Sequence, residues 1–480
     1  MRWSVADISP ATRRRALLCA GVILLAFTVR FLTAGFISAH ITDSSWFPYG
    51  IYGAFDGRAR DILDGKVGAF WVGDALTSPQ EATAAVYPPG YYLWLAFIYS
   101  VSGERSPLVV QSVQLTLDAL SVLLIIAVGA TAYGWRAGII AGLLAALSPL
   151  LAFYGAMPLA DAPTEWIVLC GALMLLLAAR RLSWRYALLA GTLFGASCWL
   201  RANGLMLGVG CALALLFFVK ASWQNALRLS AVFMLGVLLL LAPVIARNSF
   251  AFHAFVPGGM GLGTNMLEGI GETSRAEEFG AVFGDSNLIE QERAEMGLPK
   301  DAPLELYYPD GLRRDRARMN KALAVIVRHP FWFAGVMFGR MAGMLKYAGE
   351  PLKHLSTSGI NVTSKRCLPA NLQGSVLALL VNLLGALQSV LRYLLLPLMI
   401  VGAALALRRD WRATLLLLTV ILYYLVVGSA LHTELRYGLP MQALLFVFAG
   451  LTTEKIVRSL KSGVWSQKTK DTSSASDSRP

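Results

Sequence analysis

The chain has 480 residues, of which 56% are hydrophobic, and its mean hydropathy is +0.57. A soluble globular domain does not need so much apolar surface, whereas a bundle of bilayer-spanning helices does. The formal net charge is +13, but the basic residues gather at the ends of the hydrophobic segments, where lipid headgroups and membrane orientation explain them. The composition therefore excludes an ordinary soluble enzyme and argues against a nucleic-acid-binding protein.

The first apolar segment, roughly 16–38, follows the basic residues 13–15 and predicts an uncleaved span that begins in the cytoplasm. A polar stretch, 39–88 or somewhat beyond, forms the first outer loop. Within it, 55–63 carries apolar residues at helical spacing, which predicts a short interfacial helix. The apolar run 89–101 is too short for a span, so we expect an interfacial or re-entrant segment on the outer side.

Six further apolar segments follow before the sequence turns polar again. They run alternately inward and outward, at roughly 107–132, 137–156, 163–179, 184–200, 203–219 and 226–246. Counting 89–101 as a full span would put Arg136 and Arg180 outside, against the positive-inside rule. The charge distribution therefore places the polar stretch after residue 246 on the outer side.

The predicted fold is that of an all-α polytopic membrane protein. Residues 310–329 have a charged, helical pattern, and the region 331–407 supplies one span or three, with a break expected at Pro397. The divisions are a cytoplasmic N-terminus (1–15), a membrane module (16–246) that includes the first outer loop (39–106), an outer, periplasmic loop region (247–330), C-terminal membrane helices (331–454) and a cytoplasmic tail (455–480) expected to be disordered.

Four carboxylates lie at the outer ends of the predicted spans. Asp43 follows the first span and Asp56 lies on the predicted interfacial helix, so each is a candidate general base for an acceptor hydroxyl. Asp161 and Glu165 lie four residues apart at the start of an inward-running helix and share one face. Capping of the helix dipole is the structural alternative for this pair, and binding of a divalent cation is a further one.

Three arginines also lie at outer ends, against the positive-inside trend: Arg201, Arg247 and Arg436. A charged side chain at such a position needs a partner, and arginine suits bidentate binding of a phosphate group. The three positions therefore predict an anionic ligand. An internal salt bridge, with Glu434 or with the outer carboxylates, is the alternative.

The sequence shows no motif of a soluble enzyme. Its histidines are scattered without a His-x-x-x-His pair, so zinc hydrolysis has no support. Neither a Gly-x-Ser-x-Gly nor a Walker motif is present, and the glycine-rich stretch 258–263 follows a predicted span rather than a strand, unlike a dinucleotide fingerprint. No cofactor is predicted, and dependence on a divalent cation is left open.

Four motifs occur in order over about 40–440. They are Ala59–Gly65 with Tyr87–Leu93 in the first outer loop, Ala190–Gly195 leading to Arg201, Pro243–Asn248 before the glycine-rich stretch, and Arg436–Pro440. Together they resemble the GT-C class of membrane glycosyltransferases, above all bacterial relatives of dolichyl-phosphate-mannose protein mannosyltransferases and of aminoarabinose lipid A transferase. The resemblance is strong for the family and says little about the substrate.

The resemblance implies a GT-C-like bundle of about 10–12 transmembrane helices whose outer loops carry interfacial helices. It implies an inverting glycosyltransferase of the cell envelope, which moves a sugar from a polyprenyl-phosphate donor to a hydroxyl of a lipid, glycan or protein outside a bacterial inner membrane. An Asp base would take the acceptor proton while arginines hold the departing phosphate. The implied site residues are Asp43, Asp56, Asp161 and Glu165 for catalysis, Arg201, Arg247 and Arg436 for the donor phosphate, and Tyr87, Pro89, Tyr91, Asn248 and Tyr437 for substrate contacts.

The first outer loop departs from the family pattern. Many members have an Asp-Glu pair there, or an Asp shortly before a Tyr, whereas here Asp43 is followed by two serines and Asp56 by a glycine. Asp43 and Asp56 therefore both remain candidates for the general base. Asp43 is favoured because it lies nearest to the first span. Asp161 matches the second acidic position of the family, and Glu165 matches a variant of it.

A membrane transporter or a flippase for lipid-linked glycans is the alternative function. Transporters place ionisable groups near the middle of the bilayer, and Arg30 and Asp118 are the candidates for such groups. Convergence of Arg201 and Arg247 with an outer Asp in one cavity would favour the enzyme. A scatter of ionisable groups through the bundle would favour transport.

Overall fold

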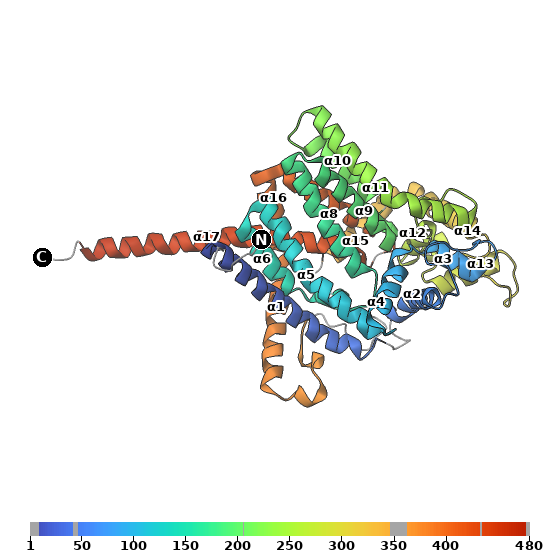
Figure 1. The fold of residues 1–480 in the computed structure, drawn as a ribbon, viewed down its shortest axis with the longest axis horizontal. Helices are drawn as coiled ribbons and strands as arrows, with labels where there is room; N and C mark the ends of the chain where they lie inside the picture. Colours follow the sequence, from blue (N-terminus) through green and yellow to red (C-terminus); the bar gives the residue numbers. More distant parts are fainter. Residues whose placement is uncertain (1–8, 42–46, 205, 346–361, 433, 477–480) are drawn as a thin grey trace, which may run out of the picture.

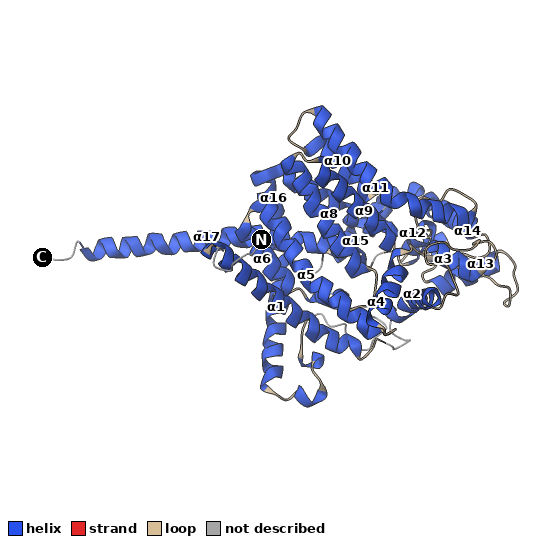
Figure 2. Ribbon diagram, viewed as in Figure 1, coloured by secondary structure: helices blue, strands red, loops and turns tan. Residues whose placement is uncertain are grey.

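The computed structural model describes residues 9–41, 47–204, 206–345, 362–432 and 434–476. Helices make up the secondary structure of these residues and no strand occurs among them (Figure 2). Figure 1 shows them as a bundle from which α17 (Leu439–Ser476) projects at one end, while α13 (Asp285–Glu295) and α14 (Gly311–Arg328) lie at the opposite end. The predicted all-α class is confirmed. It follows from the apolar runs, because a helix satisfies its own backbone hydrogen bonds inside a bilayer.

The first outer loop contains three helices. After α1 (Pro10–Ser38) come α2 (Phe47–Leu63), α3 (Pro79–Val86) and α4 (Gly90–Ser102). The helix predicted at 55–63 therefore exists but begins earlier. The short run predicted as an interfacial or re-entrant segment at 89–101 forms a helix of 13 residues. The α4 helix ends at Gly103, which has a left-handed φ of 71° that a residue without Cβ adopts at no steric cost.

The predicted spans after residue 106 are helices with nearly the predicted bounds. They are α5 (Pro107–Tyr133), α6 (Trp135–Ala146), α7 (Pro149–Gly155), α8 (Asp161–Arg181), α9 (Trp184–Leu200), α10 (Leu207–Phe218) and α11 (Trp223–Phe252). The segment predicted as one helix at 137–156 is two, bent by 63°. Ser148 causes the break: its side chain accepts a hydrogen bond from the backbone N–H of Leu151, and Pro149 starts the new helix.

The outer loop region contains α12 (Leu262–Gly271), α13 and α14. The α14 helix matches the charged pattern predicted at 310–329 and leads into α15 (Pro330–Met344) with a bend of 104°. The bend falls at His329–Pro330, because proline favours the first turn of a helix and the residue before it leaves the helical region.

The C-terminal helices differ from the prediction at one point. The break expected at Pro397 is wrong, since α16 (Val376–Ala430) continues through this residue and has its non-helical backbone at Asp410. A membrane helix tolerates proline where neighbouring groups compensate for the lost hydrogen bond. Asp410 instead starts the second half of α16, because its carboxylate accepts from the N–H of Ala413 at 3.1 Å.

Five described helices are long and apolar enough to cross a membrane, or seven if each bent pair counts as one span. The 10–12 spans expected from the family resemblance also include shorter helices such as α9 and α10, and the two halves of α16. The multi-pass architecture is therefore confirmed, and the divisions predicted along the chain remain predictions.

Close helix contacts position the end of α9. A Cβ on Gly191 would lie 2.0 Å from the carbonyl oxygen of Phe233, so α9 and α11 touch through their backbones. A Cβ on Gly90 would lie 2.5 Å from the carbonyl oxygen of Trp199, so the start of α4 touches the last turn of α9. Since Arg201 directly follows α9, these glycines bring it next to the first outer loop.

Candidate active site

The site is built around an ion pair between two predicted residues. Asp161 starts α8 and Arg201 follows α9, and Arg201 Nη1 donates to Asp161 Oδ1 at 2.6 Å. The Asp161 side chain is 1% exposed and that of Arg201 is 21% exposed. Asp161 Oδ2 is buried and has no hydrogen-bond partner among the described residues. The pair therefore has one unused acceptor oxygen and one guanidinium with access to a ligand.

Tyr437 lies between two of the predicted arginines. The guanidinium carbon of Arg201 is 4.3 Å from the centroid of its ring, and that of Arg436 is 5.2 Å away. Such cation–π contacts offset part of the repulsion between two like charges. Burial raises the pKa of the Tyr437 hydroxyl. Tyr437 thus stays neutral and holds the two guanidinium groups at fixed positions.

A chain of charged side chains fixes the buried Arg436. Its Nε donates to Glu434, and His432 donates from Nδ1 to Glu272 at 2.7 Å and from Nε2 to Glu434 at 3.2 Å. Burial alone would raise the pKa of Glu434, but Arg436 and His432 outweigh it and lower the pKa to about 2. Burial alone would lower the pKa of His432, but its two carboxylate partners raise it to about 10. His432 and Glu434 are therefore both charged at neutral pH.

The first outer loop covers this cluster with aromatic side chains. Tyr91 is fully buried and donates to Gln114 at 3.2 Å. The Phe55 ring meets Tyr87 and Tyr91 edge-on, with centroids 5.2 and 5.0 Å away. Burial raises the pKa of Tyr87, with smaller effects from Asp285, Tyr437 and Arg436. The predicted substrate residues Tyr87 and Tyr91, with Pro89 between them, therefore lie on the same side as the arginines.

Of the two candidate bases, Asp43 and Asp56, the structure describes only Asp56. Asp43 lies outside the described residues. Asp56 accepts from Tyr99 at 2.5 Å and from Tyr52 at 3.3 Å, and it forms an ion pair with Arg60 at 2.7 Å. These three donors occupy most of the acceptor sites of the carboxylate, which leaves little room for a bond to an acceptor hydroxyl.

Arg247 and Asn248 are placed differently from the other predicted ligand residues. Arg247 is fully buried and donates to the backbone carbonyls of Phe70, Ala84 and Tyr87, and also to Asn248 and to the hydroxyl of Tyr92. Asn248 in turn donates to the carbonyl of Gly258 at 2.6 Å. Arg247 therefore ties the first outer loop to α11 and has no carboxylate partner among the described residues.

Glu165 and Asp161 both belong to α8, but they interact with different residues. Its buried carboxylate oxygens have no hydrogen-bond partner among the described residues. Its electrostatic neighbours are Asp118 and Arg30, which form a buried ion pair at 2.5 Å. Each carboxylate of the predicted pair thus belongs to a different charge cluster.

Reasoning from the sequence missed three ionisable groups next to Glu434 and Arg436. These are His432, Glu272 and Glu268, which is buried and has a pKa raised to about 7 by burial first and by Asp285 second. The signal that could have found His432 is its position four residues before Arg436, with Glu434 between them. Glu272 and Glu268 carry no such signal, because α12 reaches the site only through the fold.

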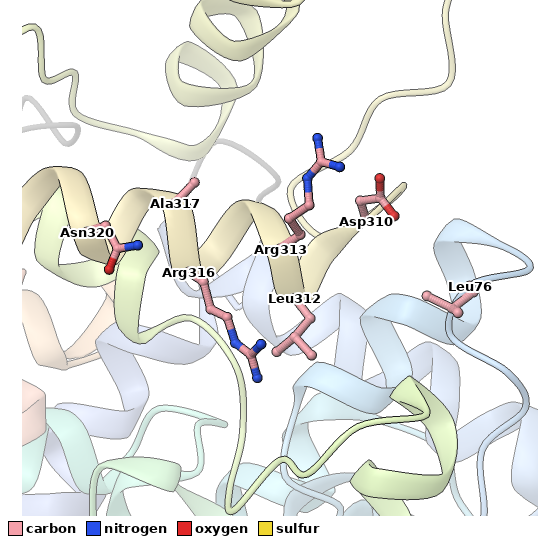
Figure 3. A pocket seen from close by; sticks show the side chains of 7 residues that line it. All are labelled: Leu76, Asp310, Leu312, Arg313, Arg316, Ala317 and Asn320. Carbon is pink, nitrogen blue, oxygen red and sulfur yellow. The ribbon is translucent and has the colours of Figure 1, made fainter.

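The pocket found among the described residues lies away from the predicted site, and these residues contain no metal-ligand cluster. The part of the chain that the structure describes contains no group of three or more His, Cys, Asp or Glu side chains that could hold a metal ion. One pocket, of about 430 Å³, lies at the start of α14 (Figure 3). Its lining contains none of the predicted site residues.

The comparisons with known proteins cover part of the chain. Residues 86–246 match the family model described as dolichyl-phosphate-mannose-protein mannosyltransferase. No curated protein matches the chain.

Solved structures of an archaeal oligosaccharyltransferase from Archaeoglobus fulgidus are similar to the chain. The apo form has 15% sequence identity and a TM-score of 0.49, with 94% of this chain and 52% of that one covered. AglB in complex with an inhibitory peptide and a dolichol-phosphate has 14% identity and a TM-score of 0.46, with 93% and 52% covered. The chain therefore spans about half the length of these proteins.

The matched segment 86–246 contains part of the site, from the end of α3 through the Asp161–Arg201 pair, whereas the Arg436 cluster lies outside it. The resemblance to dolichyl-phosphate-mannose protein mannosyltransferases of the GT-C class is therefore confirmed over the matched residues 86–246.

Proposed function

We propose that the chain is an integral-membrane glycosyltransferase that moves a sugar from a polyprenyl-phosphate donor to an acceptor hydroxyl. The observation that carries the proposal is the contact of Arg201 with both Asp161 and Tyr437. It joins the family-matched segment to the Arg436 cluster near the C-terminus. A site with fixed guanidinium groups beside an aromatic lining suits a sugar whose leaving group is anionic.

The proposed reaction is a single displacement with inversion. The acceptor oxygen attacks the anomeric carbon, the bond from that carbon to the phosphate oxygen breaks, and the electron pair leaves with polyprenyl phosphate. Arg201 is the arginine with access to the new phosphate charge, while Glu434 fixes Arg436 behind it. Binding of phosphate would draw Arg201 away from Asp161, whose freed carboxylate is then available to orient a sugar hydroxyl.

We assign to Asp43 the role of the general base, which takes the proton of the acceptor hydroxyl. The alternative, Asp56, is held by two tyrosine hydroxyls and Arg60. A base must be within reach of the acceptor and have a free lone pair, and this geometry leaves Asp56 less able to serve. Asp56 is better suited to fix α2 against α4 through the hydroxyl of Tyr99.

Arg247 has a supporting role in this proposal, together with Asn248. It holds the carbonyl of Tyr87 and so sets the entry into α4. The donor phosphate then depends on Arg201 and Arg436. The acceptor is a lipid, glycan or protein on the extracytoplasmic side of a bacterial inner membrane, reached past the outer region α12–α14.

A direct assay tests the proposal. Full-length protein in membranes is supplied with a radiolabelled sugar on polyprenyl phosphate, and envelope glycolipids and glycoproteins are analysed by mass spectrometry with and without the protein. Transfer of label that is lost in Arg201→Ala, with unchanged protein level, supports the assignment. Equal labelling by Arg201→Ala would refute the phosphate role of this residue.

Transport of a lipid-linked glycan is the second candidate, and one observation favours it. Glu165 is a buried carboxylate without a hydrogen-bond partner among the described residues and adjoins the Arg30–Asp118 pair. Ionisable groups of this kind line transport paths in other membrane proteins. Movement of intact labelled donor across a proteoliposome, with no new glycosidic bond, would identify a flippase instead.

A further inference from the structure

The outward face of α14 has an unusual order of side chains. At about 100° per residue, Arg313, Arg316, Asn320, Leu323 and Val327 fall within an arc of about 80°. All five are exposed. The stripe is therefore cationic near the start of the helix and apolar towards its end.

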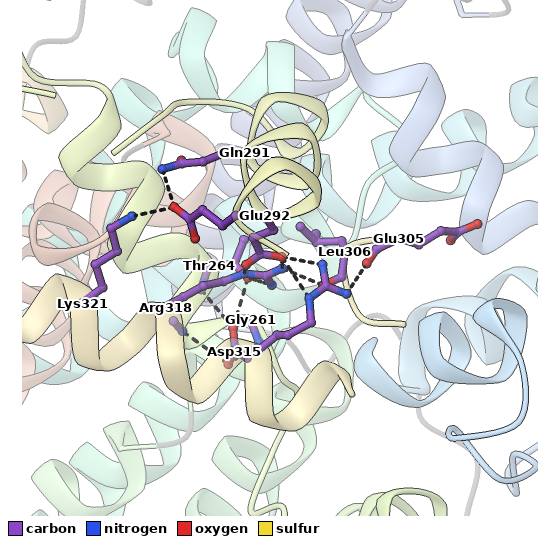
Figure 4. A network of polar contacts seen from close by, with 12 residues as sticks. Gly261, Thr264, Gln291, Glu292, Glu305, Leu306, Asp315, Arg318 and Lys321 are labelled. Atoms are coloured by element: carbon purple, nitrogen blue, oxygen red, sulfur yellow. Dashed lines mark hydrogen bonds and ion pairs between the residues drawn. The ribbon is translucent and has the colours of Figure 1, made fainter. Parts of the chain in front are cut away.

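The opposite face fixes the rotation of α14 about its axis. Asp315 accepts from the backbone N–H groups of Gly261, Gly263 and Thr264 at the start of α12. Arg314 and Arg318, also buried, form ion pairs with Glu292 of α13 at 2.5 and 2.6 Å, and Figure 4 shows this network. Because the inward face is held by so many polar contacts, Arg313 and Arg316 must point outward.

The pocket of about 430 Å³ lies at the cationic end of this stripe. Arg313, Arg316 and Asn320 line it, together with Leu76 of the first outer loop and Leu312 (Figure 3). Neither arginine makes an ion pair or hydrogen bond with another described residue. Asp310 also lines the pocket, so the lining carries two positive charges and one negative charge. The net charge of the pocket lining is therefore positive. The guanidinium groups of Arg313 and Arg316 are available to bind an anion.

The apolar end of the stripe leads to the start of α15. Val327 is 75% exposed, and Phe331, at the start of α15, is 92% exposed. In a multi-pass membrane protein such side chains are covered by hydrocarbon.

We infer that α14 binds a phosphate-bearing membrane lipid along this stripe. The phosphate sits in the pocket with Arg313 and Arg316, which suit its geometry and charge. The hydrocarbon chain runs along Leu323 and Val327 towards Phe331. This site is distinct from the Arg201–Tyr437 cluster and does not depend on the proposed transfer reaction.

Binding of hexadecyl phosphate to the full-length protein in a neutral detergent tests the inference, with native mass spectrometry as the readout. Arg313→Gln/Arg316→Gln should weaken binding by about tenfold or more, because it removes two charge-assisted contacts. Lys300→Gln/Arg328→Gln removes the same charge from exposed positions outside the pocket and should bind as the unchanged protein does. Equal affinity in the two double variants, or no binding by the unchanged protein, would overturn the inference.

Two further arms identify the source of the phosphate and the position of the chain. A hexadecyl phosphate with a photoreactive group in mid-chain should label peptides within 320–331, and labelling confined to other helices would contradict the proposed path. Inorganic phosphate should compete only at far higher concentration than hexadecyl phosphate. If it competes equally well, the pocket takes a soluble phosphate and the lipid assignment is wrong.

Discussion

Arg201 contacts Asp161 and Tyr437 at the same time, through a hydrogen bond of 2.6 Å and a cation–π distance of 4.3 Å. The three residues come from the start of α8, the end of α9 and the turn before α17. A single guanidinium therefore joins the family-matched segment to the C-terminal helices. Removal of any of the three groups should disturb the other two.

Arg201→Lys tests the planar geometry of this contact. Lysine keeps the charge but loses the flat guanidinium that stacks on Tyr437 and presents paired donors to a phosphate. We expect transfer to fall about 10- to 100-fold, from roughly 1.5–3 kcal/mol of lost interaction, with an unchanged amount of protein in the membrane. Arg185→Lys, in the first turn of α9, is the matched control, and an equal effect of both changes would contradict the assignment.

Asp161→Asn should leave Arg201 without its carboxylate. Breaking a buried ion pair costs about 3–5 kcal/mol, but Arg201 is partly exposed, so we expect roughly 1–3 kcal/mol of lost stability after screening. Thermal unfolding in detergent measures this loss, and a transfer assay should show a decrease of at least about tenfold. Asp61→Asn, at an exposed position of α2 with a single lysine partner, should change neither property.

The choice of base is tested by Asp43→Asn and Asp56→Asn. The first change should abolish transfer while the protein remains in the membrane, because the acceptor proton then has no carboxylate to go to. The second should lower thermal stability, since Tyr99, Tyr52 and Arg60 lose a charged acceptor, and should leave substantial transfer. The reverse pattern would move the base to Asp56.

His432 should make stability depend on pH in the alkaline range. Its pKa is raised from 6.5 to about 10 in the folded chain, so its contribution is complete below pH 6.5 and is lost as the pH rises towards 10. His432→Gln should therefore show a smaller fall in unfolding temperature between pH 8 and pH 10 than the unchanged protein. Identical slopes in this window would show that Glu272 and Glu434 do not stabilise the protonated form of His432.

Gly263→Ala should disrupt the outer region. The new Cβ would lie 1.9 Å from the backbone oxygen of Asp315, and backbone on both sides prevents relief. We expect a loss of roughly 1–3 kcal/mol or more, read from limited proteolysis of the α12–α14 region. Gly335→Ala on α15, where a Cβ has open space, is the control and should be neutral or slightly stabilising.

Composition and hydrophobic periodicity determined the class of this protein and most of its helix bounds. Long apolar runs have few alternatives to helix in a bilayer, so α5, α8, α9 and α11 lie where the sequence predicts them. Proline was less informative, because its effect depends on neighbours: Pro149 begins a new helix, whereas Pro397 lies within one. The residue types of the site could also be predicted from the sequence, since a buried charge at the outer end of a span is costly unless it has a partner or a ligand.

The tertiary structure alone decided which charges meet. Arg201 and Arg247 look alike in the sequence, yet one faces Asp161 and Tyr437 while the other holds backbone carbonyls. Asp161 and Glu165 share a helix but belong to separate charge clusters. Sequence patterns record which side chains are polar and on which face of a helix they lie. Partners come from helix packing, which close contacts such as Gly191 against Phe233 set across long separations in the chain.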